Sequence, residues 1–141
     1  MAGDARKELT VDACVRRACI RHASSVAVVD GGRSLTYAQL DARIDELAAA
    51  LLALALGPGD TVVACMRNRL ELVVTYLAVQ RIGAVHAPVN FRLSLVELQH
   101  CLDLVRPAAV VFEPETLSSL GANVELGSAV GLCVDFCSRE E

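Results

Sequence analysis

The spacing of apolar residues changes along the chain, and each type of spacing predicts a helix or a strand. From residue 37 to about 55, leucine and isoleucine recur every three or four residues, which places them on one face of an amphipathic helix. Further on, three short unbroken apolar runs are typical of strands buried on both faces of a parallel sheet. Helical patterns separate these runs, so the order is strand, helix, strand, helix, strand. The strands are expected at 61–66, 84–89 and 108–112, and the helices at 70–82 and 94–105.

Turn and capping residues punctuate this pattern. Asp30-Gly31-Gly32 lies between two short strand-like segments, at 26–29 and 34–36, and Asp-Gly favours a tight turn, so we predict a β-hairpin. Thr36 is expected to cap the helix that follows, and Ser94 with Glu97 forms a capping box at the start of a later helix. A further helix is expected within 9–23, capped by Thr10 or Asp12.

The pattern predicts the α/β class, with a partial doubly wound and mostly parallel sheet, flanking helices and a preceding hairpin. We expect this α/β portion to occupy residues 1–115. Residues 116–141 lack a clear period and form either a strand near 130–136 or a poorly ordered, divergent tail.

Composition excludes some classes of protein. The 141 residues carry a net charge of −4, which argues against a nucleic-acid partner, and the longest apolar run, at 47–56, is too short to span a bilayer. The six cysteines form no C-x-x-C pair and the amino terminus lacks a signal-peptide core, so we expect reduced thiols, no metal site and a cytoplasmic location. Mean hydropathy of +0.45 indicates either deep burial or an apolar face that needs covering.

Two histidine positions suggest chemistry, and each has a simpler interpretation. His86 lies within an expected buried strand, where a core histidine hydrogen-bonded to backbone is favoured over a ligand or catalytic role. His100 and Cys101 are adjacent on a helix and face different directions, which argues against a Cys–His nucleophile pair.

Charged residues leave further alternatives open. Arg67, Arg69 and Arg81 could form an anion site near a strand end, although a solvated loop and helix end is the favoured interpretation. The turn at 30–32 is not expected to cradle phosphate, because no helix begins directly after it. The acidic residues of the first long helix are expected to form its wet face and not a metal site: Asp41, Asp45 and Glu46.

Three short motifs, in order, carry a resemblance to a known family. The chain contains a Leu-Thr-Tyr-x-x-Leu box, a Gly-Pro-Gly-Asp turn after a leucine-rich helix, and a Gly-Ala-Val-x-x-Pro-x-Asn box. Together these make residues 26–112 similar to the amino-terminal part of the adenylate-forming, or AMP-binding, superfamily, in its fatty-acid–CoA ligase branch. The signature positions, which the resemblance implies are scaffold, are Leu35, Thr36, Tyr37, Leu40, Gly59, Asp60, Gly83, Ala84, Pro88 and Asn90.

The resemblance implies a parent enzyme that uses ATP, Mg²⁺ and CoA to convert a fatty acid to acyl-AMP and then to a thioester. The phosphate loop, the acidic ribose-binding residue and the catalytic lysine of that family are missing from this sequence, whose one lysine is Lys7. We therefore expect a fragment or truncated relative that is inactive by itself and has no catalytic or cofactor-binding residue, with the missing remainder of the enzyme as a possible partner. Two alternatives are a non-catalytic interaction module that self-associates and, with less support, another kind of nucleotide-binding α/β domain.

Overall fold

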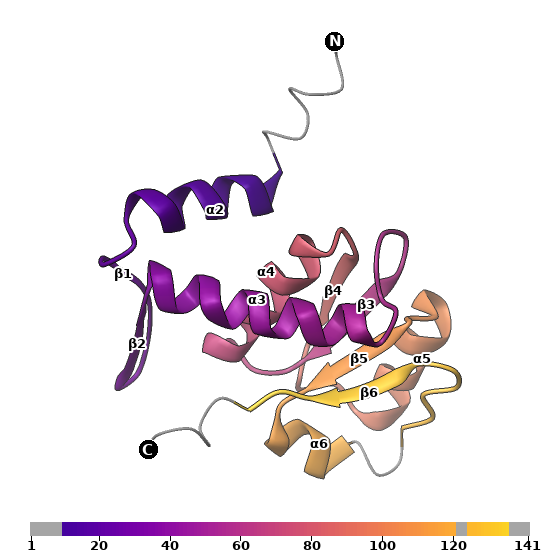
Figure 1. Cartoon of the computed structure of the whole chain (residues 1–141). Coiled ribbons are helices and arrows are strands. Elements are labelled where there is room, and N and C mark those ends of the chain that lie inside the picture. Colours follow the sequence, from indigo (N-terminus) through magenta and orange to yellow (C-terminus); the bar gives the residue numbers. More distant parts are fainter. Residues whose placement is uncertain (1–9, 121–123, 136–141) are drawn as a thin grey trace.

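The computed structural model describes residues 10–120 and 124–135, and its elements follow the expected order except for a short helix at 114–120, which the sequence pattern did not predict (Figure 1). The helices are α2 (Val11–Arg21), α3 (Tyr37–Ala53), α4 (Leu70–Arg81), α5 (Leu95–Val105) and α6 (Pro114–Leu120). The strands are β1 (Val26–Asp30), β2 (Arg33–Thr36), β3 (Thr61–Cys65), β4 (Val85–Val89), β5 (Ala109–Phe112) and β6 (Val130–Cys133). The amino-terminal lead with Lys7, and the end of the chain with Cys137, lie outside the described residues.

Local signals in the sequence set the helix starts. The Thr36 hydroxyl accepts a hydrogen bond from the Gln39 N–H, and the Gln39 side chain accepts one from the Thr36 N–H, which completes a capping box at α3. Ser94 and Glu97 form the same arrangement at α5. Thr10, and not Asp12, caps α2. These bonds satisfy backbone donors that would otherwise have no partner in the first helical turn.

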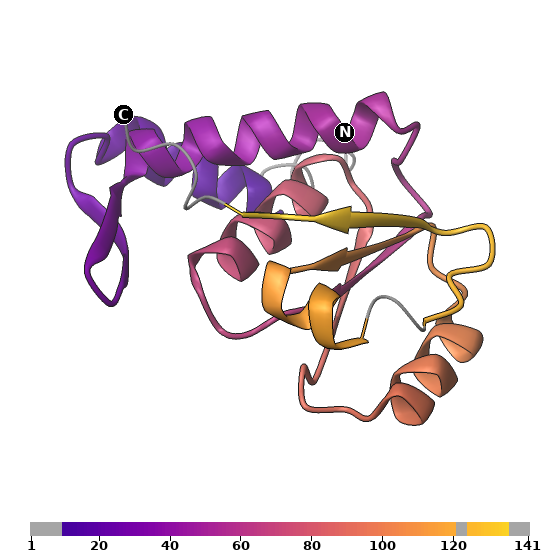
Figure 2. The ribbon, with the colours of Figure 1, turned by 90° about the horizontal axis from the view of Figure 1, so that it is seen from below.

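The four-stranded sheet is parallel throughout, with the order β4-β3-β5-β6. Alternate residues of β3 point to opposite faces: Val62 packs in the core formed with α3 and α4, and Val63 packs against α5. Figure 2 shows α3 and α4 on one side of the sheet and α5 on the other. This confirms a doubly wound arrangement with helices on both faces. The hairpin β1–β2 is a separate antiparallel pair whose turn places Gly31 at φ +58°.

The strand β4 is not a buried strand, as its apolar run predicts, but one edge of the sheet. Val85 is 53% exposed, and β3 pairs with β4 on one side only. Pro88 lies inside this strand, where it pairs with Ala64 in the ladder. An edge strand tolerates proline wherever the missing N–H would point away from the sheet.

The opposite edge is β6, which lies in the segment without a clear period. It pairs with β5 in register Ala109 with Val130 through Phe112 with Cys133. A strand near 130–136 is therefore present within the described residues. Within the same residues, no helix combines the length and apolar character needed to cross a bilayer.

Candidate functional site

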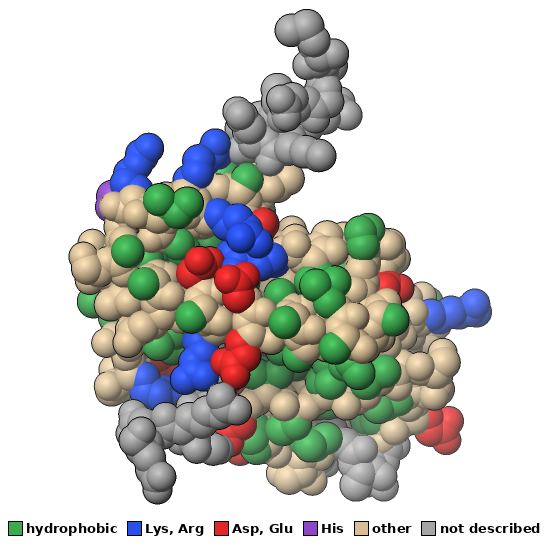
Figure 3. All heavy atoms as spheres, in the orientation of Figure 1, with side chains coloured by type: hydrophobic (Ala, Val, Ile, Leu, Met, Phe, Trp, Pro, Cys, Tyr) green, Lys and Arg blue, Asp and Glu red, His purple; other side chains and the backbone are tan. Residues whose placement is uncertain are grey.

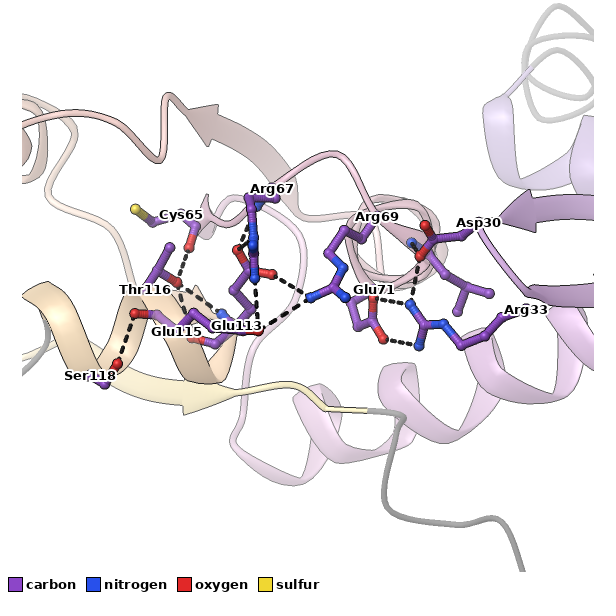
Figure 4. A network of polar contacts seen from close by, with 11 residues as sticks. Asp30, Arg33, Cys65, Arg67, Arg69, Glu71, Glu113, Glu115, Thr116 and Ser118 are labelled. Atoms are coloured by element: carbon purple, nitrogen blue, oxygen red, sulfur yellow. Dashed lines mark hydrogen bonds and ion pairs between the residues drawn. The ribbon is translucent and has the colours of Figure 1, made fainter.

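The carboxyl ends of β3 and β5 lie side by side, and a buried carboxylate links the loops that leave them. Glu113, directly after β5, is 2% exposed. Its Oε1 accepts hydrogen bonds from the Arg67 backbone N–H at 3.0 Å and from the Arg67 Nε at 2.8 Å. Open α/β sheets bind ligands at this edge, so the cluster in Figure 4 is the candidate site.

A second layer of charge surrounds this pair. The Arg67 Nη2 lies 2.8 Å from the Glu115 Oε1, and the Arg69 Nη1 lies 3.5 Å from carboxylate oxygens of both Glu113 and Glu115. The buried Thr116 hydroxyl donates to the Cys65 carbonyl oxygen at 2.8 Å and accepts from the Glu113 N–H at 3.1 Å. Beside them lies a hollow of about 180 Å³, lined mainly by carboxylates.

The hairpin contributes a neighbouring ion cluster. Arg33, on β2, binds the buried Glu71 carboxylate through two hydrogen bonds, at 2.6 and 3.1 Å, and binds the Asp30 Oδ2 at 2.6 Å. The same Asp30 oxygen accepts a hydrogen bond from the Leu70 N–H at 3.1 Å. The start of α4 has no side-chain cap of its own, so the hairpin turn supplies one.

The electrostatics of both clusters favour the ionised pairs. Hydrogen bonds from the Leu70 N–H and from Arg33 hold the pKa of Asp30 below its usual value. Burial raises the pKa of Glu71, but hydrogen bonds from Arg33 and backbone outweigh it and leave that pKa lowered. Hydrogen bonds to Glu113 and then Glu115 raise the pKa of Arg67. Burial raises the pKa of the Cys65 thiol to about 11, which makes it unsuited as a nucleophile near neutral pH.

Arg81 does not join Arg67 and Arg69, so the three arginines do not form one anion site. Its side chain is 4% exposed, and its guanidinium binds Asp12 of α2 at 2.8 Å, and Asp41 and Asp45 of α3 at 2.7 Å each. Asp41 and Asp45 therefore form ion pairs with Arg81 and do not simply line the solvent-exposed face of α3. Figure 3 shows these charges gathered between α2 and α3.

Glu46, the third acidic residue of that set, lies 3.3 Å from Arg43. Among the described residues, no three acidic, cysteine or histidine side chains are grouped to hold a metal ion. Arg67 and Arg69 are in turn paired with carboxylates, in place of the solvated loop that the sequence favoured.

The histidine interpretations also change. His86 lies on the edge strand, its ring contacts Tyr76 edge-on at 5.2 Å between centroids, and its buried Nε2 has no hydrogen-bond partner in the described structure. The expected backbone hydrogen bond at that atom is therefore absent. Burial lowers the pKa of His86, which favours the neutral ring. Among the described residues, His100 is exposed and Cys101 is a half-buried free thiol on α5, and no hydrogen bond joins their side chains.

The signature residues lie at helix starts, turns and strand ends. Leu40, on the buried face of α3, belongs to the core, and the ring centroid of Tyr37 lies 6.1 Å from that of His22. Asp60 accepts a hydrogen bond from the Gly57 N–H at 2.8 Å, next to Gly59 at φ +95°.

The second box forms the turn into β4 and the loop after it. Gly83 adopts φ +77°, and an added Cβ there would lie 3.3 Å from the Pro58 ring. Ala84 is buried, and the Asn90 side-chain oxygen accepts a hydrogen bond from the Arg92 N–H at 3.0 Å. That these positions act as a family signature stays a prediction. The structure shows only their local roles in burial, turns and hydrogen bonds.

The sequence interpretation missed the carboxylates of the candidate site. Glu71 falls in an apolar helix pattern, and Glu113 directly follows a buried strand, where a charged residue at the carboxyl end is a signal for a polar site. Glu113 is separated from Arg67 by 46 residues, so the pairing required the strand order to be known.

Comparisons with known proteins agree on one family. The AMP-binding enzyme family matches residues 15–138. A feruloyl-CoA synthase from Amycolatopsis is 38% identical over 109 residues, which cover 77% of this chain and 22% of that protein. A medium/long-chain-fatty-acid–CoA/3-oxocholest-4-en-26-oate–CoA ligase from Mycobacterium marinum is 39% identical over 88 residues, covering 62% of this chain and 16% of the ligase.

A solved structure supports the same fold. A benzoate CoA ligase from Burkholderia xenovorans superposes with a TM-score of 0.83 at 21% identity, over 90% of this chain and 26% of the ligase. The chain therefore spans about a quarter or less of the length of these relatives.

Proposed function

Because this chain belongs to the AMP-binding enzyme family, we propose that it supplies the amino-terminal scaffold of an ATP-dependent fatty-acid–CoA ligase and is inactive by itself. The complete reaction converts a carboxylate and ATP to acyl-AMP and pyrophosphate, and then acyl-AMP and CoA to acyl-CoA and AMP. The fatty-acid preference draws support from the mycobacterial relative. We also propose a cytoplasmic location, on the basis of the sequence features given above.

One observation carries the proposal of inactivity. At the carboxyl edge of the sheet, Arg67 and Arg69 are both paired with carboxylates of this chain, and the adjoining hollow is lined by Glu71, Glu113 and Glu115. A triphosphate carries several negative charges that need uncommitted cations, backbone N–H groups or a metal. The residues described at this edge therefore do not fit ATP, and no catalytic step is assigned to them.

Pyrophosphate exchange tests this proposal. The 141-residue chain is incubated with ATP, Mg²⁺, labelled pyrophosphate and either a medium-chain fatty acid or ferulate, and the intact mycobacterial ligase serves as the positive control. We expect no label in ATP with the chain alone. Exchange with either acid would refute inactivity, and the responding acid would identify the substrate class.

A chimera tests the scaffold role separately. Residues 15–138 replace the matching part of the mycobacterial ligase, and the chimera is expected to retain exchange activity. A folded chimera without activity would contradict the scaffold role. A further experiment tests the proposed division of the chain into residues 1–115 and 116–141. If this division is correct, limited proteolysis should first cleave the chain on the carboxyl-terminal side of residue 115.

A second candidate, a non-catalytic interaction module, is favoured by exposed apolar side chains such as Ile20, Val96 and Leu104. Light scattering over a range of concentrations distinguishes the two candidates. A self-associating chain favours the module, and a monomer that binds no apolar dye counts against it.

A further inference from the structure

A hollow of about 420 Å³ lies where α5 ends and where β5 and β6 begin, at the other end of the strands from the candidate site. Buried apolar residues form its floor: Leu102, Pro107 and Val110. Exposed charged side chains surround that floor: Asp103, Arg106 and Glu125. An apolar floor with a few polar groups around it is the usual composition of a small-molecule site, and such sites occupy roughly 300–1,000 Å³.

Contacts between distant parts of the chain hold this hollow in shape. The Gln99 Nε2 donates to the Asp103 Oδ1 at 3.0 Å and to the Glu125 carbonyl oxygen at 3.1 Å. The Gln99 Oε1 accepts a hydrogen bond from the Glu125 N–H at 3.0 Å. One side-chain amide therefore joins α5 to the loop that precedes β6, which runs beside α5 in Figure 2.

Leu126 completes the apolar lining, and Gly131 of β6 leaves room for it. A Cβ at Gly131 would lie only 2.8 Å from the Leu126 Cδ1. Leu126 packs with Leu102 and Val110 in the cluster on the α5 side of the sheet. The loop is thus fixed both by hydrogen bonds and by an apolar side chain, and it places Glu125 on the same hollow as Asp103.

The charges around the hollow differ from those elsewhere in the fold. Arg67 and Arg81 are bound by carboxylates of this chain. Within residues 10–120 and 124–135, by contrast, no ion pair involves Asp103, Arg106 or Glu125. Two carboxylates and one guanidinium that are not neutralised within the described structure therefore face one apolar floor.

The backbone of Arg106 supports a role for its side chain. Arg106 has φ +47°, in the left-handed region where glycine is preferred at the end of a helix. Its guanidinium forms no hydrogen bond or ion pair among the described residues, so that part of the side chain does not compensate the backbone strain. Strain of this kind is typical of residues whose side chains serve a ligand.

We propose that this hollow binds a small aliphatic zwitterion, the chemical class of leucine. The planar guanidinium of Arg106 binds the carboxylate of the ligand through paired hydrogen bonds. Asp103 and Glu125 bind its ammonium group, and its aliphatic part covers Leu102 and Val110. No reaction occurs there, and the inference does not rest on the ligase function.

Other ligand classes match the hollow less well. A phosphate or a fatty acid would bring its negative charge close to Asp103 and Glu125. A metal ion or a simple amine would leave Arg106 without a partner, and a neutral apolar molecule would cover all three charges without pairing any of them. A zwitterion with an aliphatic part neutralises both signs of charge and covers the floor as well.

Titration of the isotope-labelled 141-residue chain tests the proposal, with the amide resonances of Gly127 and Ser128 as the readout. L-leucine is the main probe. Isoamylamine lacks its carboxylate, isocaproate lacks its ammonium group, and glycine lacks its aliphatic part. We expect leucine to give saturable shifts and each of the other three to bind at least about 10-fold more weakly, because each loses charged hydrogen bonds or apolar contact. No saturable shift with leucine, or equal binding of any of the other three, would overturn the proposal.

Variants assign the two ends of the ligand. Arg106→Gly removes the guanidinium at a position whose backbone suits glycine, so we expect it to fold and to bind leucine at least about 10-fold more weakly, with unchanged binding of isoamylamine. Asp103→Asn and Glu125→Gln should weaken leucine binding and leave that of isocaproate unchanged. Arg43→Met, on α3, is the control and should bind leucine as the wild type does.

Three results with these variants would contradict the assignment. They are full leucine binding by Arg106→Gly, equal weakening of leucine and isoamylamine in that variant, and a comparable loss in Arg43→Met. Leucine-induced shifts centred on Arg67 and Glu113 would move the ligand to the candidate site and would also overturn the proposal. The ligase function is tested separately by pyrophosphate exchange and by the chimera, so it can fail while leucine binding stands.

Discussion

Arg81 donates a hydrogen bond to Asp12, 69 residues earlier in the chain, at 2.8 Å, and this contact joins the end of α4 to the start of α2. The same guanidinium also binds two carboxylates of α3, so one arginine links three helices.

Replacement of Arg81 is expected to be strongly destabilising. Arg81→Met leaves three neighbouring carboxylates without their shared cation, and by comparison with other broken buried pairs the loss is about 3 kcal/mol of unfolding free energy. Urea denaturation measures it. Arg43→Met, which breaks the exposed pair with Glu46, is the control and should cost under about 0.5 kcal/mol. Equal losses in the two variants would refute a linking role for Arg81.

His86 predicts a pH dependence of stability. Because burial lowers its pKa in the folded chain, the unfolded chain binds more protons as the pH falls through the usual histidine value of 6.5. Unfolding free energy should therefore decrease from pH 7 to pH 5.5. His86→Leu should flatten the profile in this window, whereas His100→Gln, at an exposed position, should not. An unchanged slope in His86→Leu would contradict this explanation.

Gly83 is expected to tolerate no side chain. Gly83→Ala combines a left-handed backbone with a Cβ 3.3 Å from Pro58, and we expect a loss of about 1–2 kcal/mol. Gly32→Ala, where an added Cβ meets no atom within 4 Å, is the matched control. Thermal melts of both variants test the difference, and a melting temperature for Gly83→Ala as high as that of the control would count against it.

Arg106 offers a stabilising substitution. It ends α5 in the left-handed conformation, at φ +47°, where glycine is the preferred residue. Arg106→Gly should raise the unfolding free energy by up to about 1 kcal/mol, because glycine adopts this conformation without the steric cost. Ala49→Gly, on the exposed face of α3, should instead lower it by about 1 kcal/mol. A lower unfolding free energy in both variants would show that contacts of the Arg106 side chain stabilise the fold by more than its left-handed backbone destabilises it.

The starts of α3 and α5 and the hairpin turn were predictable because their signals are local, whereas α6 (Pro114–Leu120) was not predicted. Thr36 with Gln39, and Ser94 with Glu97, lie three residues apart and act within one helical turn. Strand order is not local, because it depends on how the crossovers place each strand. The run at 84–89 therefore looked interior, although Pro88 in it was already a signal for an edge.

The candidate site was harder to predict for the same reason. The sequence identified Arg67 and Arg69 but not their partners, since Glu113 approaches them only when β5 lies next to β3. Arg81 was grouped with them by residue type alone. Its carboxylate partners come from helices that precede it by 36 to 69 residues.

The contact of Asp30 with the Leu70 N–H has a consequence for the order of assembly. The first turn of α4 gains its acceptor only after the hairpin has closed and docked, so hairpin and helix should become protected together in a pulse-labelling experiment. Among the described strands, the hairpin β1–β2 pairs with none of the main sheet. Its contact with the start of α4 therefore connects it to the layer of helices that covers that sheet.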